Sequence, residues 1–93
     1  MAHCSIEQVR DVADILETIK GWENIREKSR GVFYYKSVPF LHFHFKDEKR
    51  WADIKKKEGG WTLVPLPFQP SAAARKRFLA AATRHHQALA RRK

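Results

Sequence analysis

The segment Phe-Leu-His-Phe-His-Phe at residues 40–45 predicts a β-strand with two chemically different faces. His42 and His44 would lie on one face, and the apolar residues between them on the other. Three other short segments are rich in aromatic or β-branched residues and are bounded by turn residues. The predicted strands are therefore 31–36, 40–45, 50–55 and 61–66.

Helix signals lie at both ends of the chain. Ser5 with Gln8 three residues later has the spacing of a capping box, and Gly21 follows the last apolar residue of helical period. Ser71 precedes an alanine-rich segment, residues 72–90, with high helix propensity. We predict one α+β domain, residues 1–93, in which a four-stranded antiparallel meander is flanked in sequence by an N-terminal and a C-terminal helix.

The turn positions predict which residues oppose each other on neighbouring strands. With a hairpin tip at residues 47–48, His42 pairs with Asp53 and His44 with Trp51. A turn at residues 37–38 would pair Phe33 with His42. This register predicts one face made of Phe33, Tyr35, Phe40, His42, His44, Trp51, Asp53 and Lys55. The other face would be the core that packs against the first helix.

Three residues of the histidine face have the chemistry of metal ligands: His42, His44 and Asp53. Two imidazoles and a carboxylate form the donor sets of zinc and non-haem iron sites, so a divalent transition metal is a candidate cofactor. The alternatives are no cofactor and histidines that only pack, or His42 as a general base oriented by Asp53. No serine or cysteine stands in a nucleophile motif, which disfavours hydrolase chemistry without a metal. The sequence leaves enzymatic activity open and favours a non-enzymatic protein.

Aromatic residues of the same face are candidates for an association surface: Phe33, Tyr35, Phe40 and Trp51. An exposed aromatic sheet of this size favours either covering by the last helix or self-association, so we expect a homo-oligomer such as a dimer. Aromatic rings beside cations can also stack unpaired bases. The aromatic motif of the RNA-recognition fold is not matched at residues 30–37, however, and its strand-first order is absent.

The formal net charge of +9 is concentrated toward the C-terminus. Residues 1–23 carry −3, residues 24–69 carry +5 and residues 70–93 carry +7. Such a basic end attracts phosphate polymers, an acidic protein, or the acidic first helix of the same chain. Nonspecific nucleic-acid binding through the C-terminal helix is therefore a further hypothesis. Its candidate phosphate contacts are Arg75, Lys76, Arg77, Arg84, Arg91 and Arg92.

Cysteine content and hydropathy bear on location. Cys4 is the single cysteine, which excludes an intramolecular disulfide and favours a reducing, cytoplasmic setting. No apolar run approaches the roughly 20 residues of a membrane helix, and residues 1–5 lack the pattern of a signal peptide. We therefore expect a cytoplasmic protein with no membrane partner.

Three pieces of the sheet region carry a resemblance: Gly-Val-Phe-Tyr-Tyr at 31–35, Phe-Leu-His-Phe-His at 40–44 and Ala-Asp at 52–53. In this pattern the chain resembles a group of small uncharacterised bacterial proteins. The resemblance implies a bacterial, stand-alone domain and transfers no catalytic residue, ligand or partner. The leading hypothesis is an interaction module that self-associates, with nucleic-acid binding and metal binding as alternatives.

Overall fold

The computed structural model describes residues 4–91, which form two helical segments and one sheet. The helices are η1 (Glu7–Val12, a 3₁₀ helix), α1 (Ala13–Lys20) and α2 (Ala72–Ala90). The strands are β1 (Ile25–Ser29), β2 (Val32–Tyr35), β3 (Val38–Lys46), β4 (Lys49–Lys55) and β5 (Trp61–Pro65). They form one antiparallel sheet in the order β1-β2-β3-β4-β5, so consecutive strands pair with each other. The α+β class and the meander between two helices are confirmed.

The sheet has five strands, not the four that were predicted. The additional strand, β1, has the sequence Ile-Arg-Glu-Lys-Ser and contains a single apolar residue. It is an edge strand, and edge strands commonly carry charged side chains that discourage pairing with other chains. A strand of this composition has no hydrophobic periodicity, so sequence patterns alone did not reveal it.

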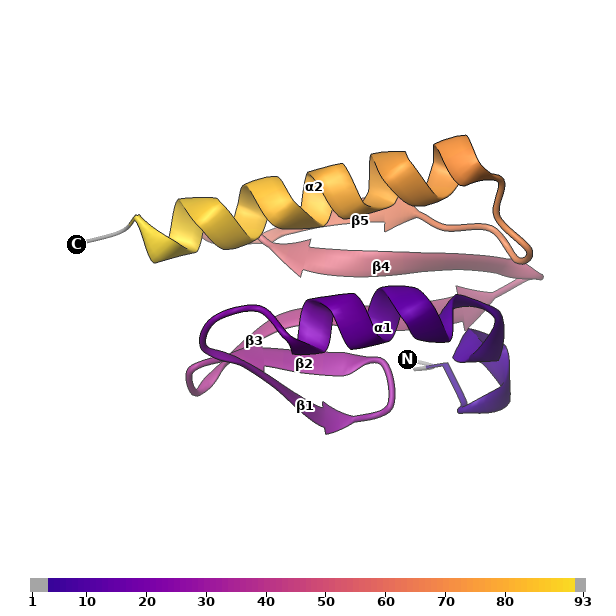
Figure 1. Ribbon diagram of the computed structural model, residues 1–93, viewed down its shortest axis with the longest axis horizontal. Coiled ribbons are helices and arrows are strands. Elements are labelled where there is room, and N and C mark those ends of the chain that lie inside the picture. The colour runs from indigo at the N-terminus through magenta and orange to yellow at the C-terminus, as the bar shows by residue number, and fades with distance from the viewer. Residues whose placement is uncertain (1–3, 92–93) are drawn as a thin grey trace.

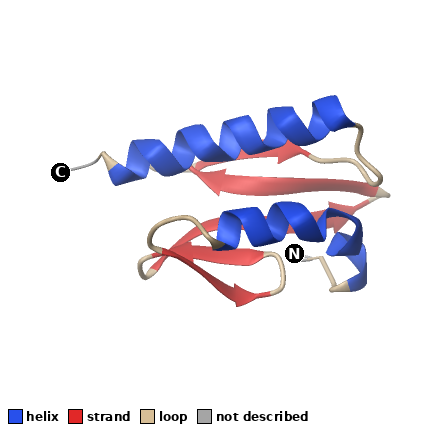
Figure 2. Ribbon diagram, in the orientation of Figure 1, coloured by secondary structure: helices blue, strands red, loops and turns tan. Residues whose placement is uncertain are grey.

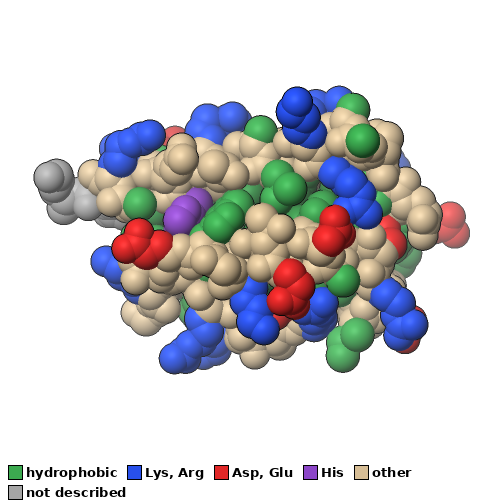
Figure 3. Space-filling model, in the orientation of Figure 1, with side chains coloured by type: hydrophobic (Ala, Val, Ile, Leu, Met, Phe, Trp, Pro, Cys, Tyr) green, Lys and Arg blue, Asp and Glu red, His purple; other side chains and the backbone are tan. Residues whose placement is uncertain are grey.

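Both helices cover the same face of the sheet (Figure 1, Figure 2). Figure 1 shows α2 over β4 and β5, and α1 over the other half of the sheet. Phe78 of α2 stacks on Phe43 of β3 with ring centroids 5.6 Å apart. Apolar side chains fill the seam between the two helices in Figure 3. The fully buried core comprises Val9, Val12, Ile15, Leu16, Ile19, Phe33, Phe40, Leu41, Phe43, Ala52, Ile54, Leu66, Phe78 and Ala82.

The predicted caps form at both helical segments. The Ser5 N–H donates to Gln8 Oε1 at 2.9 Å, and the Gln8 N–H donates to Ser5 Oγ at 3.3 Å. At the start of α2, the Ala74 N–H donates to Ser71 Oγ at 3.1 Å. These bonds satisfy backbone donors that have no partner within the helix. The first segment nevertheless begins as a 3₁₀ helix before it becomes α-helical.

The predicted register is confirmed for β3 with β4 and is wrong for β2 with β3. His42 pairs with Asp53 and His44 with Trp51, as expected from a hairpin tip at residues 47–48. The turn lies at residues 36–37 and not at 37–38, because Tyr35 pairs with Val38. Phe33 pairs with Leu41, and Tyr34 with Pro39, which leaves Phe40 as an extra residue between them. This β-bulge allows the adjacent residues Phe40 and Leu41 both to be buried.

The corrected register changes the composition of the two sheet faces. Phe33 now lies on the face that the helices cover, and Tyr34 on the other. We call the face that points away from the helices the open face. Its side chains, assigned by strand alternation and cross-strand pairing, are Arg26, Lys28, Ser29, Val32, Tyr34, Pro39, His42, His44, Lys46, Lys49, Trp51, Asp53, Lys55, Trp61, Leu63 and Pro65.

Candidate metal centre

His42, His44 and Asp53 lie together in the middle of the open face. The two histidines are alternate residues of β3, and Asp53 lies opposite His42 on β4. Strand alternation points all three side chains in the same direction. Their ligand atoms lie within 4.8 Å of one another, so the predicted cluster is formed by the fold.

His44 Nε2 is the atom on which the cluster converges. It lies 2.6 Å from His42 Nδ1 and 3.2 Å from Asp53 Oδ2. Asp53 is the direct cross-strand partner of His42, and its carboxylate nevertheless contacts His44, the diagonal neighbour.

The protonation of the two imidazoles decides which hydrogen bonds the cluster can form. A ring nitrogen of neutral imidazole is either a donor or an acceptor, and a carboxylate only accepts. If His44 Nε2 carries a proton, it can donate that proton to Asp53; if it accepts from His42 Nδ1, its lone pair points at His42 and it has no proton to donate to the carboxylate. When both of these ring nitrogens are unprotonated, a cation among the three atoms would face a lone pair from each of them. In a tetrahedral zinc site, neighbouring ligand atoms are about 3.3 Å apart, so small side-chain adjustments would accommodate the ion.

Two tryptophan rings flank the His42–His44–Asp53 cluster. The Trp61 ring centroid lies 4.8 Å from that of His42, and the Trp51 centroid lies 5.6 Å from that of His44. His44 is 1% exposed, whereas the Asp53 side chain is 26% exposed. The surroundings therefore have a low dielectric on the His44 side and remain accessible on the Asp53 side.

The predicted association residues do not form one surface. Phe33 and Phe40 are fully buried beneath the helices, and Tyr35 belongs to the same covered face. Trp51 alone remains on the open face. The prediction failed because it assumed strict alternation from β2 to β3, and the bulge at Phe40 shifts that register by one residue. Self-association itself stays a prediction, but it would require a surface without Phe33 and Phe40.

The basic residues of the C-terminal helix have different environments. Arg75 is paired with Asp14 of α1 at 2.8 Å and donates to the Asp11 carbonyl at 2.9 Å, so the acidic first helix of the same chain occupies it. The exposed residues are Lys76, Arg77, Arg84 and Arg91, and Arg92 lies outside the described residues. Figure 3 shows Lys and Arg side chains along the outer edge of α2. Phosphate binding by this helix stays a prediction.

Two further residues matter for the site or the fold and were not assigned from the sequence. Trp61 could have faced either way, because two glycines in the preceding turn permit more than one turn length. Its pairing with Lys55 now places it on the open face. Arg50 is 2% exposed and binds the N-terminal helical segment. The sequence contained a signal for this burial, because Arg50 lies opposite Phe45 on the core face.

Cys4 has no features of a reactive thiol. Cys4 is buried, and this burial raises the pKa of the thiol although the nearby Arg50 charge lowers it. Its backbone N–H donates to the Phe43 carbonyl at 3.2 Å, which holds the start of the described chain beside β3.

No protein-family model, curated protein or solved structure matches the chain. Within residues 4–91, neither helix has the combination of length and apolarity that a membrane crossing requires.

Proposed function

We propose that this protein binds a divalent transition metal ion through His42, His44 and Asp53. The observation that supports the proposal is the convergence of three potential ligand atoms within 4.8 Å on one sheet face. The three residues come from two strands whose register is set by a tight hairpin, so the site needs no loop to close around the ion.

The donor set favours zinc. Imidazole nitrogen and carboxylate oxygen are both common zinc ligands, and three protein ligands leave a fourth position for water or another ligand. That position would lie on the side where Asp53 is partly exposed. Non-haem iron uses the same residue types and is the alternative occupant.

The first experiment measures zinc binding by isothermal titration calorimetry on protein without a polyhistidine tag. We expect one zinc ion per chain. Asp53→Asn and His42→Gln change side chains that are not fully buried and should each weaken binding by at least tenfold. His85→Gln is the matched control, because His85 is a partly buried histidine on α2, away from the open face. Equal affinity in all four proteins would contradict the proposal.

A second readout uses the tryptophans that adjoin the cluster. Cobalt(II) is a spectroscopic substitute for zinc, and its d–d absorption reports coordination number. It should also quench the fluorescence of Trp51 and Trp61, whose rings contact the histidines. If cobalt quenches the fluorescence of Asp53→Asn and His42→Gln with the same titration midpoint as in the original protein, the metal binds elsewhere.

A further inference from the structure

The open face carries three aromatic rings on three different strands. Tyr34 comes from β2, Trp51 from β4 and Trp61 from β5. Trp61 is 40% exposed, the neighbouring Leu63 is 58% exposed, and the other two rings are partly buried. Both helices lie on the opposite face, so they leave these rings uncovered (Figure 1).

Cations surround the rings. The Lys28 ammonium lies 4.9 Å from the centroid of the Tyr34 ring, and the Lys55 ammonium lies 5.4 Å from that of Trp61. Strand alternation assigns five basic side chains to the open face: Arg26, Lys28, Lys46, Lys49 and Lys55. Asp53 is the one acidic side chain that the same alternation assigns to it among the described strands, and its carboxylate faces His44.

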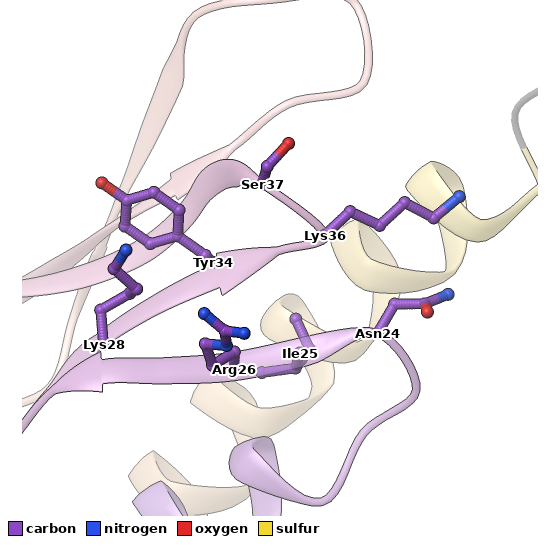
Figure 4. Close-up of a pocket in the computed structure, with 7 residues that line it drawn as sticks. All are labelled: Asn24, Ile25, Arg26, Lys28, Tyr34, Lys36 and Ser37. Atoms are coloured by element: carbon purple, nitrogen blue, oxygen red, sulfur yellow. The ribbon is translucent and has the colours of Figure 1, made fainter.

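Two hollows border this face at opposite ends of the sheet. The first, of about 420 Å³, is lined by Tyr34, Arg26, Lys28 and Lys36 and has no carboxylate in its wall (Figure 4). The Lys36 side chain points away from the Tyr34 ring, and its ammonium lies 5.6 Å from the centroid of the Tyr35 ring. Figure 4 shows the Lys28 amino group beside that ring.

The second hollow, of about 360 Å³, lies beside Trp51. Its wall includes Lys46 and Lys49, and also Asp47. Both volumes lie at the lower end of the range for small-molecule pockets, which suits one nucleobase or nucleotide in each.

We propose that the open face binds single-stranded nucleic acid without sequence preference. Rings on the surface of a sheet can stack only on bases that are not already paired, and the lysines and arginine would meet the phosphates. A duplex would present its phosphates but not its base faces. A second copy of the chain is disfavoured on this face, because each copy would present five cations against one carboxylate.

The test is fluorescence anisotropy of labelled oligo(dT) and oligo(rU), each 12 nucleotides long, at two salt concentrations and in the presence of EDTA. EDTA separates this binding from the proposed metal site. We expect similar affinities for the two oligonucleotides and affinity that falls as salt rises. Trp51→Leu and Trp61→Leu should each weaken binding by roughly tenfold or more, while Trp51→Phe, which keeps a ring, should retain most of it.

Two charge variants locate the phosphate-binding residues. Lys46→Gln with Lys49→Gln should lower the slope of log affinity against log salt by about 0.7 for each phosphate that the protein no longer neutralises. Arg77→Gln with Arg84→Gln removes equal charge from exposed positions on α2 and should change the slope less. Circular dichroism of each variant would confirm that it is folded.

Four results would overturn the proposal. The first is absence of salt-sensitive binding, and the second is equally tight binding of a 12-base-pair duplex. The third is loss of binding only in the Arg77 and Arg84 variant, which would assign the nucleic-acid site to α2. The fourth is a dimer, seen by light scattering, that Trp61→Leu dissociates and that excludes the oligonucleotide.

Discussion

Arg50 donates two hydrogen bonds to the carboxylate of Asp11, at 2.6 and 3.1 Å, and thereby joins β4 to η1. Its remaining donors reach three backbone carbonyls at 2.8 Å each, those of Gln8, Leu66 and Pro67. All five N–H donors of the guanidinium are therefore satisfied. The centroid of the Phe68 ring lies 4.2 Å from the guanidinium carbon. One buried side chain thus connects the N-terminal helical segment, the sheet and the segment that leads into α2.

Replacing Arg50 should destabilise the protein strongly. Arg50→Met removes five hydrogen bonds, leaving the Asp11 carboxylate with the Gln69 N–H and taking the Arg50 donor from three carbonyls. Removing one partner of a buried ion pair typically costs about 3–5 kcal/mol. Arg50→Lys should recover only part of this loss, because an ammonium has three donors and cannot bind the carboxylate in the same planar way. Urea unfolding followed by circular dichroism measures both. Lys49→Met, at the neighbouring exposed position, should stay within about 0.5 kcal/mol of the original protein.

The Asp11 carboxyl should contribute to acid unfolding. Burial alone would raise its pKa, but hydrogen bonds from Arg50 and the Gln69 N–H, with the Arg50 charge, outweigh burial and hold the pKa below its ordinary value of 3.8. A depressed carboxyl pKa contributes stability that is present above the ordinary value and is lost as pH falls through the lower value of the folded state.

The measurement is the free energy of unfolding between pH 7 and pH 2 for the original protein and for Asp11→Asn. The variant should be less stable at neutral pH and should show a shallower decline below about pH 4. Parallel declines in the two proteins would show that Asp11 does not carry this part of the acid response.

The corrected register predicts different losses of stability for two adjacent aromatic residues. Phe33 is fully buried, so Phe33→Ala should cost about 3–5 kcal/mol through the cavity it leaves. Tyr34 is partly exposed on the open face, so Tyr34→Ala should cost clearly less. Denaturant unfolding of the two variants provides the comparison. A larger loss from Tyr34→Ala would support the register without the bulge at Phe40.

The hairpin tip between β3 and β4 stores backbone strain that substitution should relieve. Asp47 and Glu48 have φ values of 54° and 63°, a left-handed conformation that costs residues with a Cβ roughly 1–2 kcal/mol. Glu48→Gly should therefore raise the free energy of unfolding by up to about 1 kcal/mol. Ser37→Gly is the control, because Ser37 is an exposed turn residue without a positive φ and should lose stability. A gain of stability in the control, or none in Glu48→Gly, would contradict this explanation.

Features that depend on residues close together in the chain were predictable. The reciprocal bonds of Ser5 and Gln8, the Ser71 cap and the β3–β4 hairpin all involve partners a few residues apart. That hairpin pairs His42 with Asp53, so the candidate metal cluster followed from local turn position and strand alternation alone. The polar strand β1 could not be found in this way, because pairing with β2 and not hydrophobic pattern places it in the sheet.

Local patterns in the chain were enough to predict the α+β class, the caps, and the side-by-side arrangement of His42, His44 and Asp53. They did not reveal which sheet face the helices cover. Phe40 and Leu41 are both buried only because a bulge lets them fit beneath the helices, and this depends on packing volumes contributed by α1 and α2. Placement of both helices on that face leaves Trp51 and Trp61 beside the histidines on the other. The outcome is set by packing between distant residues, which no local pattern encodes.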